Sequence, residues 1–337
     1  MNANVKKVLQ YAVFLLIGIF LLWLSVKNIP SEHLTKTRKS FEHADYWIVF
    51  ISILISNLAH VVRASRWNLL LKPIGYPVRF WNSFSAVMIG YMVNYALPRV
   101  GEISRCGIVS KYDGVPFATA VGTVILERIL DLFCLLIVFA ITLFLQFSEL
   151  KTLTKEHIIN PAKNLTLSIS SNQALLVSLV LLMIACVFSI WIMRKKIRLF
   201  LKGKIGTAIK KLFDGLKSIW ELKQPINFIF QSLLIWFLYF LGLYSCMFCL
   251  PETAVMSPAV SMSVLLFSTI GVIVSPGGMG AYQLISTAVL LYYGLDNGAA
   301  YAFPWIAWLS QLVGILLVGL ICFISLPYFN KSEHAEN

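Results

Sequence analysis

The stretch NYALPRVGEISR, residues 94–105, closes an apolar run that begins at Phe80. Pro98 has no backbone N–H and its ring clashes with the preceding turn, so a helix that starts at Phe80 should break there. Gly101 permits the tight backbone that a reversal needs. Inside a bilayer, interrupted backbone is tolerated only where protein or a water-filled cavity surrounds it. The stretch therefore predicts a re-entrant hairpin, which enters the membrane and returns to the same side.

A second stretch repeats this pattern. The apolar run from Ser257 to Val274 ends in SPGGMGAYQ, residues 275–283, and a shorter apolar arm continues to Gly294. This second arm reaches only about 20 Å as a helix, which is short for the roughly 30 Å of a bilayer core. We therefore expect a second re-entrant hairpin, with two full spans as the alternative for Ser257–Gly294.

The composition places the chain in the membrane class. Hydrophobic residues make up 58% of the sequence, and no polar segment is long enough to form a separate soluble domain. The net charge of +13 does not predict a nucleic-acid partner, because the basic residues lie between apolar runs, as in the positive-inside pattern. The six cysteines are scattered, and the pair at Cys246 and Cys249 has no second Cys or His pair. Lipid-facing or packed thiols are therefore expected, and no metal site.

The order of the apolar runs predicts an all-α, polytopic membrane helical bundle. Outside the hairpins, spans are expected at residues 8–26, 45–62, 117–147, 173–193, 226–249 and 299–326. Each half then holds three spans and one hairpin, in repeat one (residues 8–147) and repeat two (residues 173–326). Because three is odd, the two repeats are inverted, and interrupted segments at matching positions are typical of a transporter site near the midplane.

The connecting segments predict the orientation. The connector from Arg63 to Arg79 carries no acidic residue, so we expect it in the cytoplasm, with both termini on the same side of the cell (inner) membrane. The first run could be a signal peptide, but it lacks a small-x-small cleavage site, which favours a retained anchor. Lys27–Ala44 is expected to be a polar loop. A single membrane domain, residues 1–326, would precede a disordered cytoplasmic tail, residues 327–337.

Charged residues inside the run 117–147 form a candidate site. Glu127 and Asp131 share one helix face, and Arg128 can pair with Asp131 three residues away. Ionisable residues within a span are costly and usually face a bundle interior or an aqueous cavity. The alternative is an over-long helix whose first turns protrude, so that these charges lie at the interface.

The most basic part of the chain is the segment 194–225, in which apolar residues recur at helical spacing. The pattern predicts an amphipathic helix on the cytoplasmic leaflet, held by apolar burial and anionic lipid. A basic loop that only sets the topology is the alternative. The same segment could also recruit a separate transferase.

If the two hairpin tips meet at mid-depth, they form a site for an anionic ligand. Arginine binds phosphate through its planar fork, and glycine amides at a helix start attract anions. The residues predicted to bind substrate are Asn94, Arg99, Glu102, Arg105, Glu127, Arg128, Asp131, Gly277, Gly278, Gly280 and Gln283. His60, Arg63 and Arg66 are expected at a secondary cavity or interface. In the alternative interpretation Arg99 and Arg105 anchor the chain at the interface, and Pro276–Gly280 is an ordinary turn.

The sequence does not predict an enzyme. It shows no Ser/His/Asp or Cys/His arrangement, and the glycine run lacks the lysine and the strand of a phosphate-binding loop. No catalytic residue, cofactor or metal is predicted.

Three motifs together resemble the lysylphosphatidylglycerol synthase transmembrane region, also called the flippase-like domain family, and a fourth is weaker. They are Asn94-x-x-x-Pro98-x-x-Gly101-Glu102-x-x-Arg105, Glu127-Arg128-x-x-Asp131, Pro276-Gly277-Gly278-x-Gly280 and, as the weaker one, Arg63-x-x-Arg66-Trp67. The resemblance implies an integral membrane protein that moves lipids or lipid-linked head groups between leaflets. Because the chain ends soon after its last span, the synthase activity of fused family members is not expected here. Gln283 departs from the family pattern, in which an acidic residue is frequent, and this argues against a cationic or proton-coupled role at that position.

Taken together, the sequence predicts a non-enzymatic transporter that moves an anionic phospholipid or a polyprenyl-linked lipid between leaflets. The expected partners are membrane lipids. The alternative is a non-catalytic membrane subunit that recruits a separate lipid-modifying or glycosyl transferase.

Overall fold

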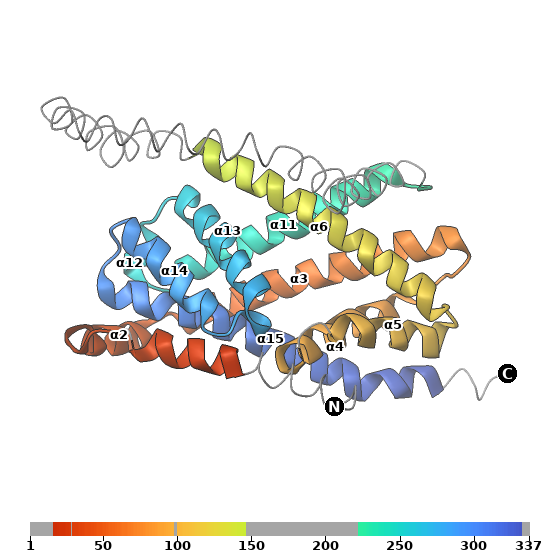
Figure 1. Ribbon diagram of the computed structural model, residues 1–337, viewed down its shortest axis with the longest axis horizontal. Helices are drawn as coiled ribbons and strands as arrows, with labels where there is room; N and C mark the ends of the chain where they lie inside the picture. Colours follow the sequence, from red (N-terminus) through yellow and green to blue (C-terminus); the bar gives the residue numbers. More distant parts are fainter. Residues whose placement is uncertain (1–15, 28, 98–99, 146–221, 332–337) are drawn as a thin grey trace, which may run out of the picture. The chain divides into compact units, whose positions relative to one another are not determined.

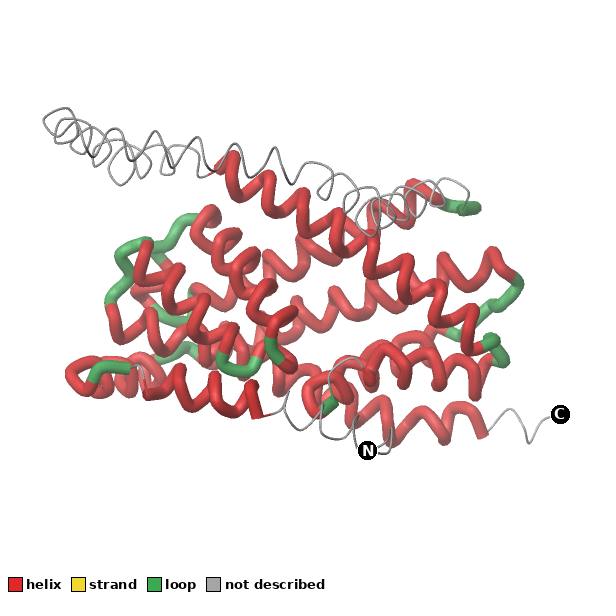
Figure 2. Tube along the Cα trace, in the orientation of Figure 1, coloured by secondary structure: helices red, strands yellow, loops and turns green. Residues whose placement is uncertain are grey.

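The computed structural model describes residues 16–27, 29–97, 100–145 and 222–331, and all of its regular elements there are helices (Figures 1 and 2). In chain order they are the helix Leu16–Lys27, α2 (Ser31–His43), α3 (Tyr46–Leu71), η1 (Lys72–Ile74), α4 (Phe80–Ala96), α5 (Val100–Asp113), α6 (Phe117–Leu145), α11 (Pro225–Met247), α12 (Pro251–Ala254), α13 (Pro258–Val274), η4 (Pro276–Gly278), α14 (Ala281–Tyr292) and α15 (Asn297–Lys331). Among the described residues, four helical stretches are long and apolar enough to cross a membrane: Tyr46–Ile74, Phe117–Leu145, Pro225–Met247 and Asn297–Asn330. The predicted all-α membrane class is confirmed.

The chain divides into two compact units, residues 1–142 with 222–337, and residues 143–221. Nearly all of the second unit lies outside the described residues. The predictions for residues 8–15, the loop 148–172, the span 173–193, the basic segment up to residue 221 and the tail 332–337 also lie outside them.

Helices α3 and α11 pack along each other and form the centre of this unit. Gly242 on α11 allows the close approach, since a Cβ atom there would collide with Ser56 Oγ on α3. The Gly242 carbonyl also accepts a buried hydrogen bond of 2.8 Å from Ser52 Oγ on α3. Nearby, Ala59 and Ile235 are fully buried in the same apolar contact. In a bilayer, close backbone approach and hydrogen bonds of this kind associate helices where the hydrophobic effect cannot.

The first hairpin consists of α4 and α5, which pack side by side. Gly101 lies against the backbone of Gly90, and a Cβ atom on Gly101 would collide with the Gly90 carbonyl oxygen. Asn94 Oδ1 accepts a hydrogen bond of 2.9 Å from the Gly101 amide, which satisfies an open donor at the start of α5. Glycine on both arms and this cap explain why the chain reverses here.

The base of this hairpin is fixed to the C-terminal end of α15. Asn82 Nδ2 donates to both carboxylate oxygens of Asp113, at 3.0 and 2.9 Å. Asn330 Nδ2 in turn donates to Asn82 Oδ1 at 3.0 Å. This network joins the start of α4, the end of α5 and the end of α15.

The second hairpin consists of α13, η4 and α14. Gly271 on α13 allows the start of α14 to approach, since a Cβ atom there would lie 3.0 Å from the backbone of Ala281 and Tyr282. Gly277 (φ 55°) and Gly280 (φ 74°) in the tip adopt left-handed backbone, which glycine adopts without strain.

The two hairpins enter from opposite ends of α15 and meet at their tips (Figure 1). The second hairpin connects to α15 at Asn297, whereas the first is fixed at Asn330. At the tips, Gly277 packs against the ring of Tyr95. The Gly277 carbonyl accepts a hydrogen bond of 2.8 Å from Trp308 Nε1 on α15.

Two connecting segments differ from the sequence-based expectation. The predicted loop Lys27–Ala44 forms the helix α2, which packs on the start of α15, where Gly298 lies against Lys36. The predicted tail also begins later, because α15 continues through residues 327–331 and is held there by the Asn330 hydrogen bonds.

Candidate functional site

A cluster of charged side chains joins α3 to α6. Arg63 Nη1 donates to Asp131 Oδ2 at 2.7 Å, and Arg66 Nη2 donates to Asp131 Oδ1 at 3.0 Å. Arg63 and Arg66 lie three residues apart on α3, so both guanidinium groups reach the same carboxylate. The weak sequence motif around Arg63 therefore contributes the direct partners of the acidic helix.

Glu127 is the most buried carboxylate of this cluster, at 1% exposed. Its carboxylate accepts hydrogen bonds from Arg66 on α3 at 3.3 Å and from Arg105 on α5 at 2.7 Å. Glu127 on α6 therefore connects the first hairpin to α3. The guanidinium of Arg105 lies 3.9 Å from the ring centre of Trp67, in a cation–π contact. Trp67 donates in turn to Thr123 on α6 at 2.9 Å.

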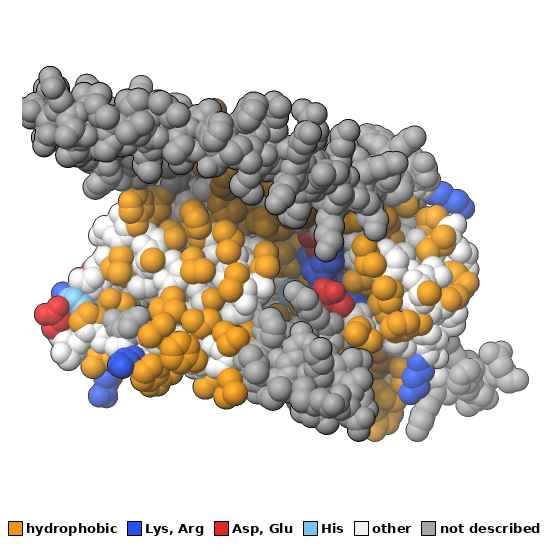
Figure 3. Space-filling model, in the orientation of Figure 1, with side chains coloured by type: hydrophobic (Ala, Val, Ile, Leu, Met, Phe, Trp, Pro, Cys, Tyr) orange, Lys and Arg blue, Asp and Glu red, His pale blue; other side chains and the backbone are white. Residues whose placement is uncertain are grey.

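Arg128 and Glu102 form the exposed edge of the cluster. Their ion pair is 2.7 Å long, and the side chains are 40% and 37% exposed. A second carboxylate, that of Asp131, lies 3.6 Å from Arg128 Nη1. Figure 3 shows basic and acidic side chains beside a hollow among hydrophobic surfaces.

The cluster has an excess of positive charge. Its four arginines, Arg63, Arg66, Arg105 and Arg128, face three carboxylates, Glu102, Glu127 and Asp131. With all groups ionised, one positive unit remains. In a low-dielectric setting this excess favours an anion.

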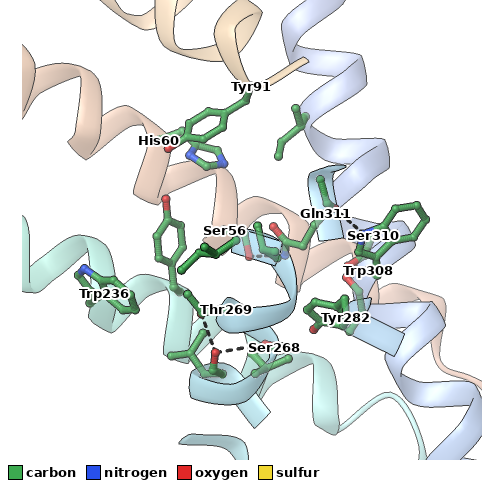
Figure 4. Close-up of a pocket in the computed structure, with 18 of the residues that line it drawn as sticks. Ser56, His60, Tyr91, Trp236, Ser268, Thr269, Tyr282, Trp308, Ser310 and Gln311 are labelled. Carbon is green, nitrogen blue, oxygen red and sulfur yellow. Dashed lines mark hydrogen bonds between the residues drawn. The ribbon is translucent and has the colours of Figure 1, made fainter. Parts of the chain in front are cut away.

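A cavity of about 490 Å³ lies between the charged cluster and the second hairpin. Figure 4 shows part of its lining, including His60, Trp236 and Gln311. Side chains of α3, α4, α6, α11, α13, α14 and α15 line it, together with Gly277 of the second tip. The polar and aromatic lining residues are Ser52, Ser56, His60, Arg63, Tyr91, Tyr95, Arg128, Asp131, Trp236, Tyr239, Ser268, Thr269, Tyr282, Trp308, Ser310 and Gln311. The cavity thus has one charged wall and a larger neutral, aromatic wall.

One edge of the cavity is apolar and reaches the outer surface. Leu132 on α6 and Val272 and Ile273 on α13 line the cavity and are 43%, 46% and 68% exposed. An elongated molecule could therefore place a polar end inside and an apolar end between α6 and α13.

The predicted substrate residues are distributed over several places in the structure. Arg128, Asp131 and Gly277 line the cavity, while Glu102, Arg105 and Glu127 belong to the charged cluster behind it. Asn94 caps α5 and is not among the lining residues. Of the residues assigned to a secondary cavity or interface, His60 and Arg63 line the main cavity, and Arg66 is fully buried in the cluster. Arg99 lies outside the described residues.

Two other glycines of the second tip, Gly278 and Gly280, pack against neighbouring segments. Gly280 packs against the backbone of Leu21 and Leu22, and Gly278 lies close to Val272. Neither Gly278 nor Gly280 is among the residues that line the cavity, whereas Gly277 is. Gln283 is 1% exposed, and neither of its side-chain polar atoms has a hydrogen-bond partner among the residues that the structure describes.

Several lining residues carry no distinctive sequence signal. Gln311 Nε2 donates to Ser56 Oγ at 2.8 Å across the neutral wall, and Arg63 Nη2 lies 3.4 Å from the Tyr239 hydroxyl. Single polar residues within apolar runs, as Gln311 is, were the available signal. Within the part of the chain that the structure describes, no group of three His, Cys, Asp or Glu side chains could hold a metal ion.

Comparison with known proteins identifies the family to which the chain belongs. Residues 9–319 match the family described as the lysylphosphatidylglycerol synthase TM region. The chain is 24% identical to a UPF0104 membrane protein of Methanocaldococcus jannaschii, over 82% of this chain and 83% of the relative. It is 23% identical to a UPF0104 membrane protein of Pyrococcus horikoshii, over 93% of this chain and 96% of the relative. No solved structure matches the chain significantly. Because the family match spans most of the sequence, the chain is a membrane protein that belongs to the lysylphosphatidylglycerol synthase TM region family.

Proposed function

We propose that the protein moves an anionic lipid, either a phospholipid or a polyprenyl-linked lipid, between the leaflets of the cell membrane, and that it does so without catalysing a reaction. The observation that carries the proposal is the cavity between the two hairpins, with Arg63, Arg128 and Asp131 on its wall. Polar head groups cross a bilayer slowly because the hydrocarbon core offers them no partner. A polar cavity within a helical membrane protein removes this barrier.

Arg128 is the residue best placed to hold the anion. It lines the cavity, and its ion pairs use Nε, to Glu102, and Nη1, to Asp131. Within the described residues Nη2 has no hydrogen bond or ion pair, so it can donate to a phosphate oxygen. Arg63 lies on the same wall but is committed to Asp131 and Tyr239.

The hairpin geometry supports alternating access. The two hairpins enter from opposite ends, and their tips meet beside the cavity at Tyr95 and Gly277. Displacing one tip would open a path toward one end only, as in transporters with inverted repeats. In our proposal the connector between α3 and α4 and both termini lie in the cytoplasm. The apolar edge between α6 and α13 lets acyl or polyprenyl chains remain in lipid while the head group moves.

A leaflet-exchange assay tests the proposal. The protein is reconstituted in liposomes with tail-labelled phosphatidylglycerol, and the label in the outer leaflet is quenched chemically over time. Wild-type protein should accelerate exchange, and Arg128→Gln should slow it by about ten-fold or more, as for the loss of one charged hydrogen bond. Arg38→Gln is the matched control, because Arg38 also pairs with a glutamate but is 82% exposed on α2.

The proposal is wrong if wild-type protein leaves exchange at the rate of protein-free liposomes. Equal exchange by wild type and Arg128→Gln would remove the site assignment. A product with a changed chemical structure, detected in the extracted lipids, would contradict the non-enzymatic part.

A further inference from the structure

We propose that the head group is a phosphate followed by a neutral polyol, such as glycerol, inositol or a sugar, and not a phosphate followed by an amine. This inference rests on the proposed function and narrows its substrate class. It is carried by the division of the cavity into one charged wall and one neutral, hydroxyl-rich wall.

The charged wall does not favour an ammonium group. Asp131 is the one carboxylate among the described lining residues. Both of its oxygens are already engaged, by Arg63 at 2.7 Å and by Arg66 at 3.0 Å. An amine in the cavity would therefore face guanidinium groups without an uncommitted anion, and like charges in a low-dielectric site repel strongly.

The neutral wall offers partners for hydroxyl groups. Gln311 Nε2 donates a hydrogen bond to Ser56 Oγ, whereas Gln311 Oε1 has no hydrogen-bond partner among the described residues. It can therefore accept from a ligand hydroxyl. The indole nitrogen of Trp236 and Nδ1 of His60 are buried and have no hydrogen-bond partner within the part of the chain that the structure describes. Buried donors and acceptors without a hydrogen-bond partner destabilise the folded protein unless a ligand or water molecule satisfies them.

Aromatic rings add an apolar surface beside these groups. Tyr95 and Trp308 lie edge to face, with ring centres 6.4 Å apart, and both line the cavity. The C–H faces of a polyol ring can pack on such rings while its hydroxyl groups bond at the rim. This combination of ring faces and neutral hydrogen-bonding groups is the chemistry that recognises a sugar or inositol.

The spacing along α3 matches such a head group. Ser56, His60 and Arg63 recur at intervals of four and three residues, so they share one helix face. At 1.5 Å per residue, Ser56 and Arg63 are separated by about 10 Å along the axis. Arg63 and Arg128 contact the same oxygen, Asp131 Oδ2, at 2.7 and 3.6 Å, so a phosphate held by Arg128 would lie at the Arg63 end of this face. The length then accommodates one polyol near Ser56 and Gln311.

The test compares tail-labelled lipids that share acyl chains and differ in head group. Phosphatidic acid carries the phosphate alone, phosphatidylglycerol and phosphatidylinositol add a polyol, and phosphatidylethanolamine adds an amine. In the exchange assay wild-type protein should move the two polyol lipids faster than phosphatidylethanolamine. Gln311→Leu should slow the polyol lipids by about five- to ten-fold, as for one lost hydrogen bond, and leave phosphatidic acid nearly unchanged. Gln231→Leu is the control, since Gln231 lies on α11 outside the cavity lining.

The same lipids are also tested for binding in detergent, through the rise in unfolding temperature that each one causes. Wild-type protein should be stabilised more by phosphatidylinositol than by phosphatidylethanolamine, and Gln311→Leu should lose this difference. Binding without exchange would support the head-group class and refute lipid movement. Stabilisation by free inositol phosphate equal to that by phosphatidylinositol would support the same chemistry with a soluble ligand, and would also refute lipid movement.

Two results would overturn the inference. The first is equal exchange and equal stabilisation by polyol and amine lipids. The second is a Gln311→Leu protein that slows phosphatidic acid as much as phosphatidylinositol, because Gln311 would then not contact the polyol.

Discussion

Replacing Glu127 by glutamine should destabilise the protein strongly, whereas the same change at Glu102 should cost little. Both carboxylates pair with arginine at 2.7 Å, to Arg105 and Arg128 respectively. They differ in burial, because the Glu127 side chain is 1% exposed and that of Glu102 is 37% exposed. Removing one partner of a buried pair leaves an uncompensated charge and costs about 3–5 kcal/mol. An exposed pair contributes only about 0–1 kcal/mol.

Two arginines, Arg66 and Arg105, form ion pairs with Glu127 and would lose them in the Glu127→Gln protein. Arg66 is fully buried and keeps Asp131 at 3.0 Å, whereas Arg105 is 4% exposed and loses its one ion pair among the described residues. We therefore expect the larger share of the cost to come from Arg105. The double variant Glu127→Gln with Arg105→Gln should recover part of the loss, since it removes the unpaired charge.

The assay is reversible unfolding of purified protein in mixed micelles, followed by circular dichroism as the denaturing detergent increases. Glu127→Gln should lower the free energy of unfolding by several kcal/mol more than Glu102→Gln does. Equal losses in the two variants would refute the burial argument. A double variant less stable than Glu127→Gln would refute the assignment of the cost to an unpaired arginine.

Two further predictions concern the hairpin contact and a helix cap. Gly101→Ala places a Cβ atom against the Gly90 carbonyl, so it should lower the free energy of unfolding by about 1–3 kcal/mol. Gly107→Ala, on the same helix with nothing within 4 Å, should not destabilise, and similar losses in both variants would contradict the close contact. The Gly298 amide donates a hydrogen bond of 2.9 Å to the Asp296 carboxylate and holds the pKa of that group below its usual value. The ionised carboxylate therefore adds to the free energy of unfolding above about pH 4, and this stabilisation is lost as the pH falls further. Asp296→Asn should reduce the fall in unfolding temperature between pH 6 and pH 3, and an unchanged pH profile would contradict this cap.

The sequence was most informative where a residue breaks a regular pattern. Pro98 and Pro276 interrupt apolar runs, and the structure has one helical hairpin made of α4 and α5 and another made of α13 and α14. Charges inside an apolar helix, such as Glu127 and Asp131, indicated a buried cluster because bilayer insertion makes unpaired charges costly. Both signals depend on local chemistry alone.

Other features depend on packing between distant segments, which local patterns do not contain. Spacing within one helix could pair Arg128 with Asp131, but it could not show that Arg63 and Arg66 on α3 bind the same carboxylate. The glycines of the second tip seemed suited to an anion, yet Gly280 packs against the helix Leu16–Lys27. The helix α2 was missed because its many charged residues resemble a loop, although it is stabilised by contact with α15.

The central claim is that the two hairpin tips meet beside the cavity. In a background in which the six native cysteines are replaced by alanine, Tyr95→Cys with Gly277→Cys should form a disulfide in membranes under mild oxidation. A Cβ atom on Gly277 would lie 3.1 Å from Tyr95 Cγ, which places the two Cβ atoms within the range of a disulfide. The control pair, Tyr95→Cys with Gly294→Cys at the base of the second hairpin, should not cross-link.

The decisive measurement is lipid exchange by the Tyr95→Cys, Gly277→Cys protein before and after oxidation. Our account predicts that cross-linked protein loses exchange and that reduction restores it, because the tips must separate to open the cavity. Failure of the pair to cross-link, or undiminished exchange by fully cross-linked protein, would contradict it.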